Sequence, residues 1–203
     1  MRIAALSFPL VMTTMAVADA QQAPPVILVY RDRILAGHDS EYVAIETDAA
    51  HICAKLRCPN PYLAIESLDG THEVWFLNGF RSRAHEDAVA AKYKANTKLS
   101  AALADITMRK KGVVGEAREA TMRQVESRPR AWRFFAGGDD YVVVATGGAL
   151  LDVSARYRAP NGEELLFVSA ATRRAADSIA ALRSGARVFV VRRDLSMPSL
   201  TRR

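Results

Sequence analysis

The side chains of this chain that are suited to acid–base chemistry lie in its first half. His85 opens a predicted helix that begins at Ser82, and it stands beside Glu86 and Asp87. An imidazole titrates close to neutral pH, which makes His85 the candidate general acid or base. Tyr30 adds a phenol from a predicted strand and is the second candidate catalytic residue. The alternative is that His85 is an ordinary surface side chain.

Residues 73–80 are predicted to form a strand that could line a ligand site. Successive side chains of a strand point to opposite faces, so Trp75 is expected on one face and Phe76 and Asn78 together on the other. Trp75, Phe76 and Asn78 are the candidate ligand-binding residues. The alternative is a row of core aromatic side chains with incidental polar neighbours.

No motif in the sequence points to a cofactor or a metal. A Ser-His-Asp set, a phosphate-binding loop and HExxH are all absent, and the paired glycines lack the strand–GxGxxG–helix context. His38, His51 and His72 are predicted to lie on the surface, with His51 as an alternative pocket base. The prediction is therefore a protein without a metal or a built-in cofactor.

Cys53 and Cys58 are the two cysteines of the chain, and they are predicted to form a disulfide. Five positions along an unbroken helix would point the side chains in different directions. The bridge therefore requires the preceding helix to unwind at Leu56-Arg57. A redox-active pair is the alternative, although the spacing is wider than CxxC.

Residues 1–20 have the pattern of a secretory signal. Arg2 precedes a mostly apolar stretch, and Ala18-Asp19-Ala20 offers a small-x-small cleavage site, so cleavage is expected after Ala20. The mature chain is predicted to be periplasmic or secreted and to contain no transmembrane segment. The alternative is a membrane anchor.

The charge is unevenly distributed along the chain. Residues 21–105 hold nine Lys and Arg against eleven Asp and Glu, a net of −2, whereas residues 106–203 hold eighteen against ten, a net of +8. The basic half could meet an acidic partner or a lipid surface, or it could be a solvated surface. No motif that reads a nucleic-acid groove is present, and nucleic acid is not a predicted partner.

Hydrophobic periodicity and turn residues predict an α+β chain with antiparallel sheets. A ferredoxin-like βαββαβ module over residues 21–128 is expected to contain a hairpin at Asp69-Gly70 and to end in a strand over residues 120–127. A smaller β-rich α+β module follows over residues 129–194, either as a degraded copy of the first or as part of one shared sheet. Residues 195–203 are predicted to be a flexible tail.

Residues 26–82 resemble the dimeric α/β-barrel superfamily in the pattern of antibiotic-biosynthesis-type monooxygenases. The pattern is a strand, Gly37, a helix over residues 41–56, the hairpin over residues 62–80 and Phe80-Arg81-Ser82 at the next helix start. The chain is also similar to uncharacterised exported bacterial proteins. The resemblance implies a barrel made from two sheets, completed by a homodimer or by the second half of the chain. The heme-degrading members carry an Asn where this chain has Tyr30, so that activity is not expected.

Three functions remain open from the sequence. The first is an exported protein that binds a small apolar ligand or a protein partner. The second is a cofactor-independent monooxygenase-like enzyme with Tyr30, Trp75, Asn78 and His85 around a cavity. The third is a structural or assembly module that docks through its basic C-terminal half. A superfamily fold hosts many chemistries and does not choose among them.

Overall fold

The computed structural model describes residues 22–135 and 137–197, and the predicted signal sequence lies outside them. The elements of the first half are β1 (Val26–Ile34), α1 (Asp39–Leu56), β2 (Tyr62–Ser67), β3 (Glu73–Phe80), α2 (Arg83–Ala95), α3 (Thr97–Lys110) and β4 (Val114–Ser127). Those of the second half are β5 (Tyr141–Ala145), β6 (Ser154–Arg158), β7 (Glu164–Ala170), α4 (Arg173–Ala181), β8 (Arg187–Arg192) and a short 3-10 helix, η1 (Arg193–Leu195).

The strands of the described residues form one closed antiparallel barrel in the order β1-β3-β2-β8-β5-β7-β6-β4. The first half contributes the run β4-β1-β3-β2, and the second half contributes β8-β5-β7-β6, which is the same ferredoxin-like order. The second half has no helix between its first two strands. The pairs β2–β8 and β4–β6 join the halves. The second half of the chain thus completes the barrel, and the two predicted modules share one sheet.

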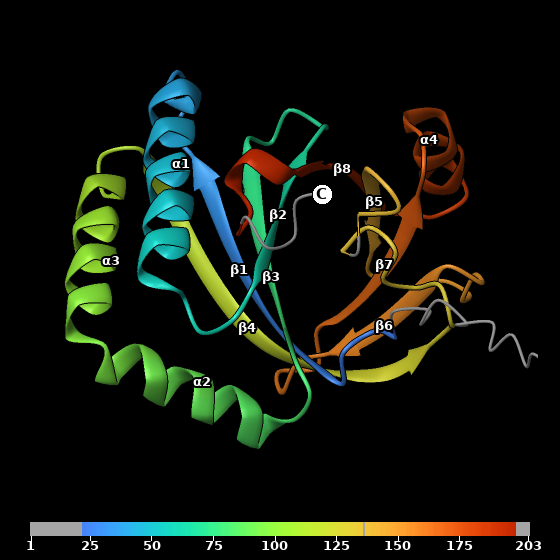
Figure 1. Cartoon of the computed structure of the whole chain (residues 1–203). Coiled ribbons are helices and arrows are strands. Elements are labelled where there is room, and N and C mark those ends of the chain that lie inside the picture. Colours follow the sequence, from blue (N-terminus) through green and yellow to red (C-terminus); the bar gives the residue numbers. More distant parts are fainter. Residues whose placement is uncertain (1–21, 136, 198–203) are drawn as a thin grey trace, which may run out of the picture.

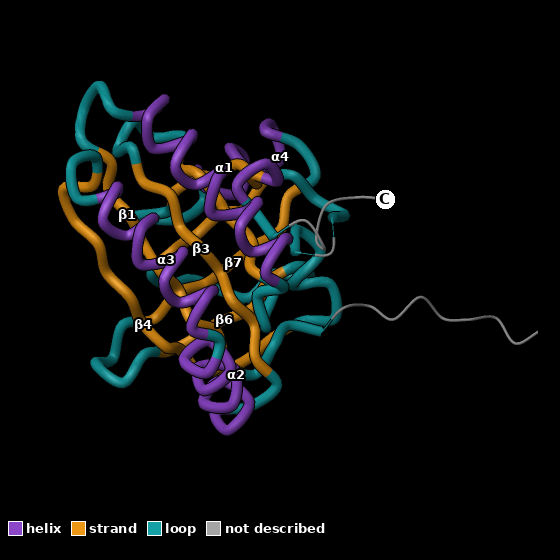
Figure 2. The backbone as a smooth tube through the Cα atoms, turned by 60° about the vertical axis from the view of Figure 1, so that its left-hand side comes forward, coloured by secondary structure: helices purple, strands orange, loops and turns teal. Residues whose placement is uncertain are grey.

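The helices cover the outside of the barrel unequally (Figure 1). Three of the four lie on the first half, and α1 and α3 run side by side across the outer face of β1, β3 and β4 (Figure 2). Only α4 covers the second half, where it packs on β5, β7 and β8. The first half of the sheet is therefore covered by more helices than the second half.

The helix ends follow from local side chains. The Ser82 hydroxyl accepts a hydrogen bond from the backbone N–H of His85 at 3.1 Å and begins α2, and Asn96 accepts one from Leu99 at 3.1 Å and begins α3. The helix α1 ends where Arg57 takes a left-handed conformation, with φ of 56°. That break is the unwinding predicted from the cysteine spacing, and Cys53 and Cys58 are joined by a disulfide with their Cα atoms 4.7 Å apart.

Three features differ from the prediction. The turn between β2 and β3 spans residues 68–72 and is longer than a tight two-residue turn, because Thr71 donates hydrogen bonds to Asp69 and holds an open loop. The strand β4 begins at Val114 and not at residue 120, since residues 114–123 pair with β1. The predicted tail begins at Leu195, yet Leu195, Ser196 and Met197 are buried.

Large side chains fill the inside of the barrel. The connection between the two halves folds inward, and Trp132, Phe134 and Phe135 pack against Tyr157 and Phe167. Trp132 and Phe134 are 1% and 0% exposed. The barrel interior is therefore a packed core over most of its length.

Candidate functional site

A cavity of about 540 Å³ lies on the outer face of the first-half sheet, beneath the helices. We call it the helix-side cavity. Its floor is formed by alternate residues of β1 and β3, including Leu28, Tyr30 and Phe76, which face α1 and α3. Ala49 of α1 and Leu103 of α3 form its roof. Alternation explains the arrangement, because the neighbouring residues of the same strands point into the barrel.

A charged cluster closes one end of the helix-side cavity. Lys110, the last residue of α3, forms an ion pair with Asp32 of β1 and a second one with Glu46 of α1, Nζ to Oε1 2.6 Å. The Tyr42 hydroxyl donates to Asp32 Oδ2 at 2.7 Å. Asp32 is 0% exposed and Glu46 4% exposed. A buried charged group of this kind is stable only because partners from three elements surround it.

Two carboxylate oxygens of this cluster accept no hydrogen bond, and of these Glu46 Oε1 still has its ion pair with Lys110. Asp32 Oδ1 is buried and accepts no hydrogen bond within the described residues. The Asp32 side chain lines the helix-side cavity together with Glu46 and Lys110. A ligand that carries a hydroxyl or amino hydrogen could therefore satisfy this oxygen, since an unpaired buried acceptor is costly.

Burial and mutual attraction set the protonation of the cluster. Burial raises the pKa of Glu46, and Lys110 limits the rise. Burial alone would lower the pKa of Lys110, but Glu46 and Asp32 outweigh that effect and raise it. Burial and the charge of Asp32 also raise the pKa of Tyr30. The lysine is thus held as a cation, and Glu46 is the carboxylate of the cluster whose pKa burial raises.

The other end of the helix-side cavity is largely apolar. Tyr62 and Tyr93 line it, and Tyr62 packs edge-on against Phe76 with ring centroids 5.8 Å apart. Asn78 adds an amide beside Leu28, its partner across β1 and β3. The cavity therefore offers flat aromatic walls, one charged end and one neutral amide, a composition typical of sites for small organic ligands.

The structure brings some of the sequence-predicted site residues together and separates others. Tyr30, Phe76 and Asn78 line the helix-side cavity. Trp75 lies on the opposite face of β3, inside the barrel, where it packs against Phe189 with ring centroids 4.8 Å apart. His85 is not among the lining residues; its ring lies at the start of α2, beside Phe80.

Sequence reasoning missed the charged cluster. Asp32 lies on the same face of β1 as Leu28 and Tyr30. An acidic residue on an otherwise apolar strand face is unusual, and this was the one signal in the sequence that could have indicated a buried charge. Glu46 adjoins the apolar stripe of α1, but nothing in the sequence links it to Lys110, which is 64 positions further along the chain. Among the described residues, no group of three or more His, Cys, Asp or Glu could hold a metal ion, and no helix is long and apolar enough to cross a membrane.

No family model and no curated protein sequence matches the chain. Its structure is similar to two proteins named as putative monooxygenases, from Fusobacterium nucleatum (9% identity, TM-score 0.49, 84% of this chain and 92% of that one) and from Lactobacillus acidophilus (10%, 0.47, 83% and 93%). An uncharacterized NIPSNAP domain protein from Burkholderia xenovorans is 16% identical with a TM-score of 0.38, over 47% of this chain and 90% of that one. Likenesses of this strength concern layout alone, and the fold described above rests on the strand order.

Proposed function

We propose that the protein is an exported binding protein that holds a small, largely apolar ligand in the helix-side cavity. The observation that carries the proposal is the cavity itself, about 540 Å³ with aromatic walls and a buried charged cluster at one end. The ligand lies between Tyr62, Phe76 and Leu103, and a polar hydrogen on it meets Asp32 Oδ1. The Cys53–Cys58 disulfide supports export, because such bridges persist in oxidising compartments.

The test compares binding of a fluorescent probe by the wild-type protein and by a variant in which a large side chain fills the helix-side cavity. The neutral fluorescent amine N-phenyl-1-naphthylamine is titrated into the wild-type protein and into Leu103→Trp, which places a large ring in the cavity. Leu182→Trp, at a side chain that is 82% exposed, is the matched control. We expect saturable binding by the wild type and the control, and an affinity lower by about tenfold or more for Leu103→Trp. Equal binding by all three proteins, or no saturable binding by the wild type, would exclude the proposal.

The second candidate is a cofactor-independent monooxygenase-like enzyme in the same cavity. The observation that favours it is the buried acid–base cluster, in which Glu46 has a raised pKa and adjoins Lys110. Tyr30 then orients a substrate and does not act as a base, because its own pKa is raised. A Glu46→Gln protein that binds the probe normally but loses turnover of an activated phenol, followed by oxygen consumption, would support this candidate over simple binding.

The arginines give less support to the third function, docking on an acidic partner or a lipid surface through the basic C-terminal half. Arg173 pairs with Asp177, Arg193 with Asp140, and Arg192 with Glu66 and Asp194. Cations that are already engaged within the chain offer less attraction to an acidic surface.

A further inference from the structure

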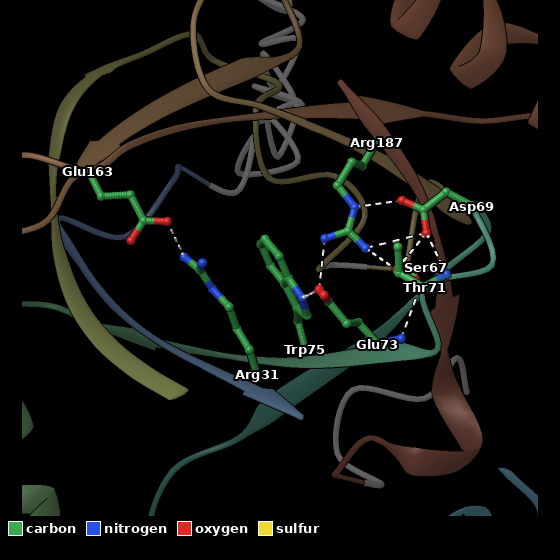
Figure 3. Close-up of polar contacts among 8 residues, drawn as sticks. All are labelled: Arg31, Ser67, Asp69, Thr71, Glu73, Trp75, Glu163 and Arg187. Atoms are coloured by element: carbon green, nitrogen blue, oxygen red, sulfur yellow. Dashed lines mark hydrogen bonds and ion pairs between the residues drawn. The ribbon is translucent and has the colours of Figure 1, made fainter. Parts of the chain in front are cut away.

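A layer of charged side chains lines one mouth of the barrel, on the inner face of the sheet (Figure 3). It borders a second pocket, of about 290 Å³, which shares Asp32 and Glu116 with the lining of the helix-side cavity. Arg31 and Arg33 of β1 point there because they alternate with Tyr30 and Asp32, which face the helices. Arg118 of β4 is paired directly opposite Arg31. Arg187 of β8 completes the set from the far side.

Arg31 is only partly satisfied by its neighbours. Its guanidinium carbon lies 4.3 Å from the centre of the Trp75 ring, and its Nη2 lies 2.9 Å from Glu163 Oε1, on the turn between β6 and β7. That contact is an ion pair without hydrogen-bond alignment, and buried Nη2 has no hydrogen-bond partner within the described residues. A polar hydrogen therefore remains available at the mouth.

Arg187, in contrast, is fully engaged. It donates to Asp69 at 2.6 Å and to Glu73 at 2.7 Å, and it also bonds to Thr71. Figure 3 shows this network on one side of Trp75 and Arg31 on the other. Arg187 and its partners form one wall of the pocket, and the arginines that could bind a ligand lie on β1 and β4.

That side carries excess positive charge. The Arg33 side chain forms no ion pair or hydrogen bond in the described part of the chain. Arg118 pairs only with Glu116, and both are largely exposed. Like charges directly opposite each other across two strands repel, as Arg31 and Arg118 do here. Two other acids border the pocket but are already paired, Glu73 with Arg187 and Asp32 with Lys110. Three arginines on the β1–β4 side are thus left with two carboxylates, Glu116 and Glu163.

We propose that this mouth binds a small oxyanion, a carboxylate or a phosphate group, between Arg31, Arg33 and Arg118. A planar guanidinium binds two oxygens of either group at once, which lysine cannot do. The oxyanion takes the free hydrogen of Arg31 and relieves the repulsion between Arg31 and Arg118. Trp75 supplies a flat wall for the carbon portion of the ligand. This site is distinct from that of the helix-side ligand, because Arg31 and Trp75 lie on the inner face of the sheet and Tyr30 and Phe76 on the outer face.

The test is calorimetric titration of the full protein with inorganic phosphate and, in a second arm, with succinate, at constant ionic strength. We expect saturable binding of at least one anion, and the stronger arm identifies the group. Arg33→Gln and Arg118→Gln, which change exposed side chains and leave the core intact, should each weaken binding by about threefold to tenfold. Glu163→Gln should tighten binding, because it removes the carboxylate that competes for Arg31.

Arg173→Gln, on α4, is the matched control and should bind like the wild type. Binding that is equal in the Arg33, Arg118 and Arg173 variants would mean non-specific attraction and would overturn the proposal, as would heat signals that do not saturate in either arm. Retained binding of N-phenyl-1-naphthylamine in the Arg33 and Arg118 variants separates this site from the function of the helix-side cavity.

Discussion

The two faces of β1 and β3 are packed differently in this protein. On the inner face, Val29 and Leu77 join a core that the connection between the halves fills with aromatic rings. On the outer face, Tyr30 and Phe76 border a cavity of about 540 Å³. The same strands supply both faces, so strand composition does not explain the difference. The inner face meets the strands of the other half of the barrel and the inward-folded connection, whereas the outer face meets α1 and α3 and the charged cluster of Asp32, Glu46 and Lys110.

The difference has a physical reason. Side chains from the barrel strands and the connection interdigitate inside, whereas Asp32, Glu46 and Lys110 link β1, α1 and α3 through ion pairs at one end of the helix-side cavity. Charged groups need their partners at fixed distances and do not collapse to fill space as apolar side chains do. A buried ion cluster is thus a spacer as well as a polar site.

The largest effect is expected on the packed face. Trp132→Ala should lower the free energy of unfolding by about 3–5 kcal/mol, because it empties a fully enclosed site in the barrel. Trp132→Phe is the matched control and should cost less, since the indole N–H has no partner there. Urea unfolding followed by circular dichroism measures both. A loss below about 1 kcal/mol for Trp132→Ala would break the comparison, since it would show that the interior is not packed.

The charged cluster gives the next effect. Lys110→Met leaves Asp32 and Glu46 buried without a cation and should cost about 3–5 kcal/mol at neutral pH. Lys111→Met, at the exposed neighbour, is the control. The loss should shrink as the pH falls, because Glu46, whose pKa burial already raises, takes up a proton and no longer needs the lysine. A loss that stays constant with pH would contradict this account.

A smaller effect isolates one hydrogen bond of the cluster. Tyr42→Phe removes the donor to Asp32 Oδ2 and should cost about 1.5–3 kcal/mol, the range for hydrogen bonds to charged groups. Tyr141→Phe, whose hydroxyl makes no hydrogen bond in the described residues, is the control and should be nearly neutral. Thermal unfolding of both variants provides the measurement, and equal melting temperatures would argue against the bond.

The smallest effect concerns acid stability at the barrel mouth. Burial would raise the pKa of Asp69, but hydrogen bonds from Arg187 and Thr71 outweigh it and lower the pKa from 3.8 to about 2. Because the folded pKa is depressed, Asp69 adds stability above pH 3.8 and loses it as the pH falls toward 2. Asp69→Asn should therefore reduce the pH dependence of unfolding in that window, while Asp105→Asn, at an exposed acid, should not. The effect is small because Asp69 and Arg187 are partly exposed, so that solvent screens their interaction.

Local pattern was enough to predict much of the fold. The turn residues and alternation predicted the hairpin strands β2 and β3, and the pattern predicted a helix beginning at Ser82, whose hydroxyl caps α2. The cysteine spacing predicted the break at Arg57. Weaker patterns failed at the edges: β4 is longer than expected because pairing with β1, not its own composition, makes residues 114–119 a strand.

The candidate site was predicted in part. Shared alternation indicated that Phe76 and Asn78 lie on one face, and Tyr30 joins them in the helix-side cavity. His85 was chosen as a catalytic candidate because of its residue type, and the structure places it outside the cavity lining. The cluster of Asp32, Glu46 and Lys110 could not be predicted, because its members come from elements distant in the chain.

The sequence by itself determined the elements, their facing residues and the disulfide, since those depend on neighbours within a few positions. Only the tertiary structure decided where on each face of the sheet the packing is complete and where a cavity remains, because that depends on what distant segments bring to each face. The closure of the barrel by β5–β8 and the aromatic connection filled most of the inside, and on the outside an apolar cluster and the ion cluster at Lys110 border the helix-side cavity.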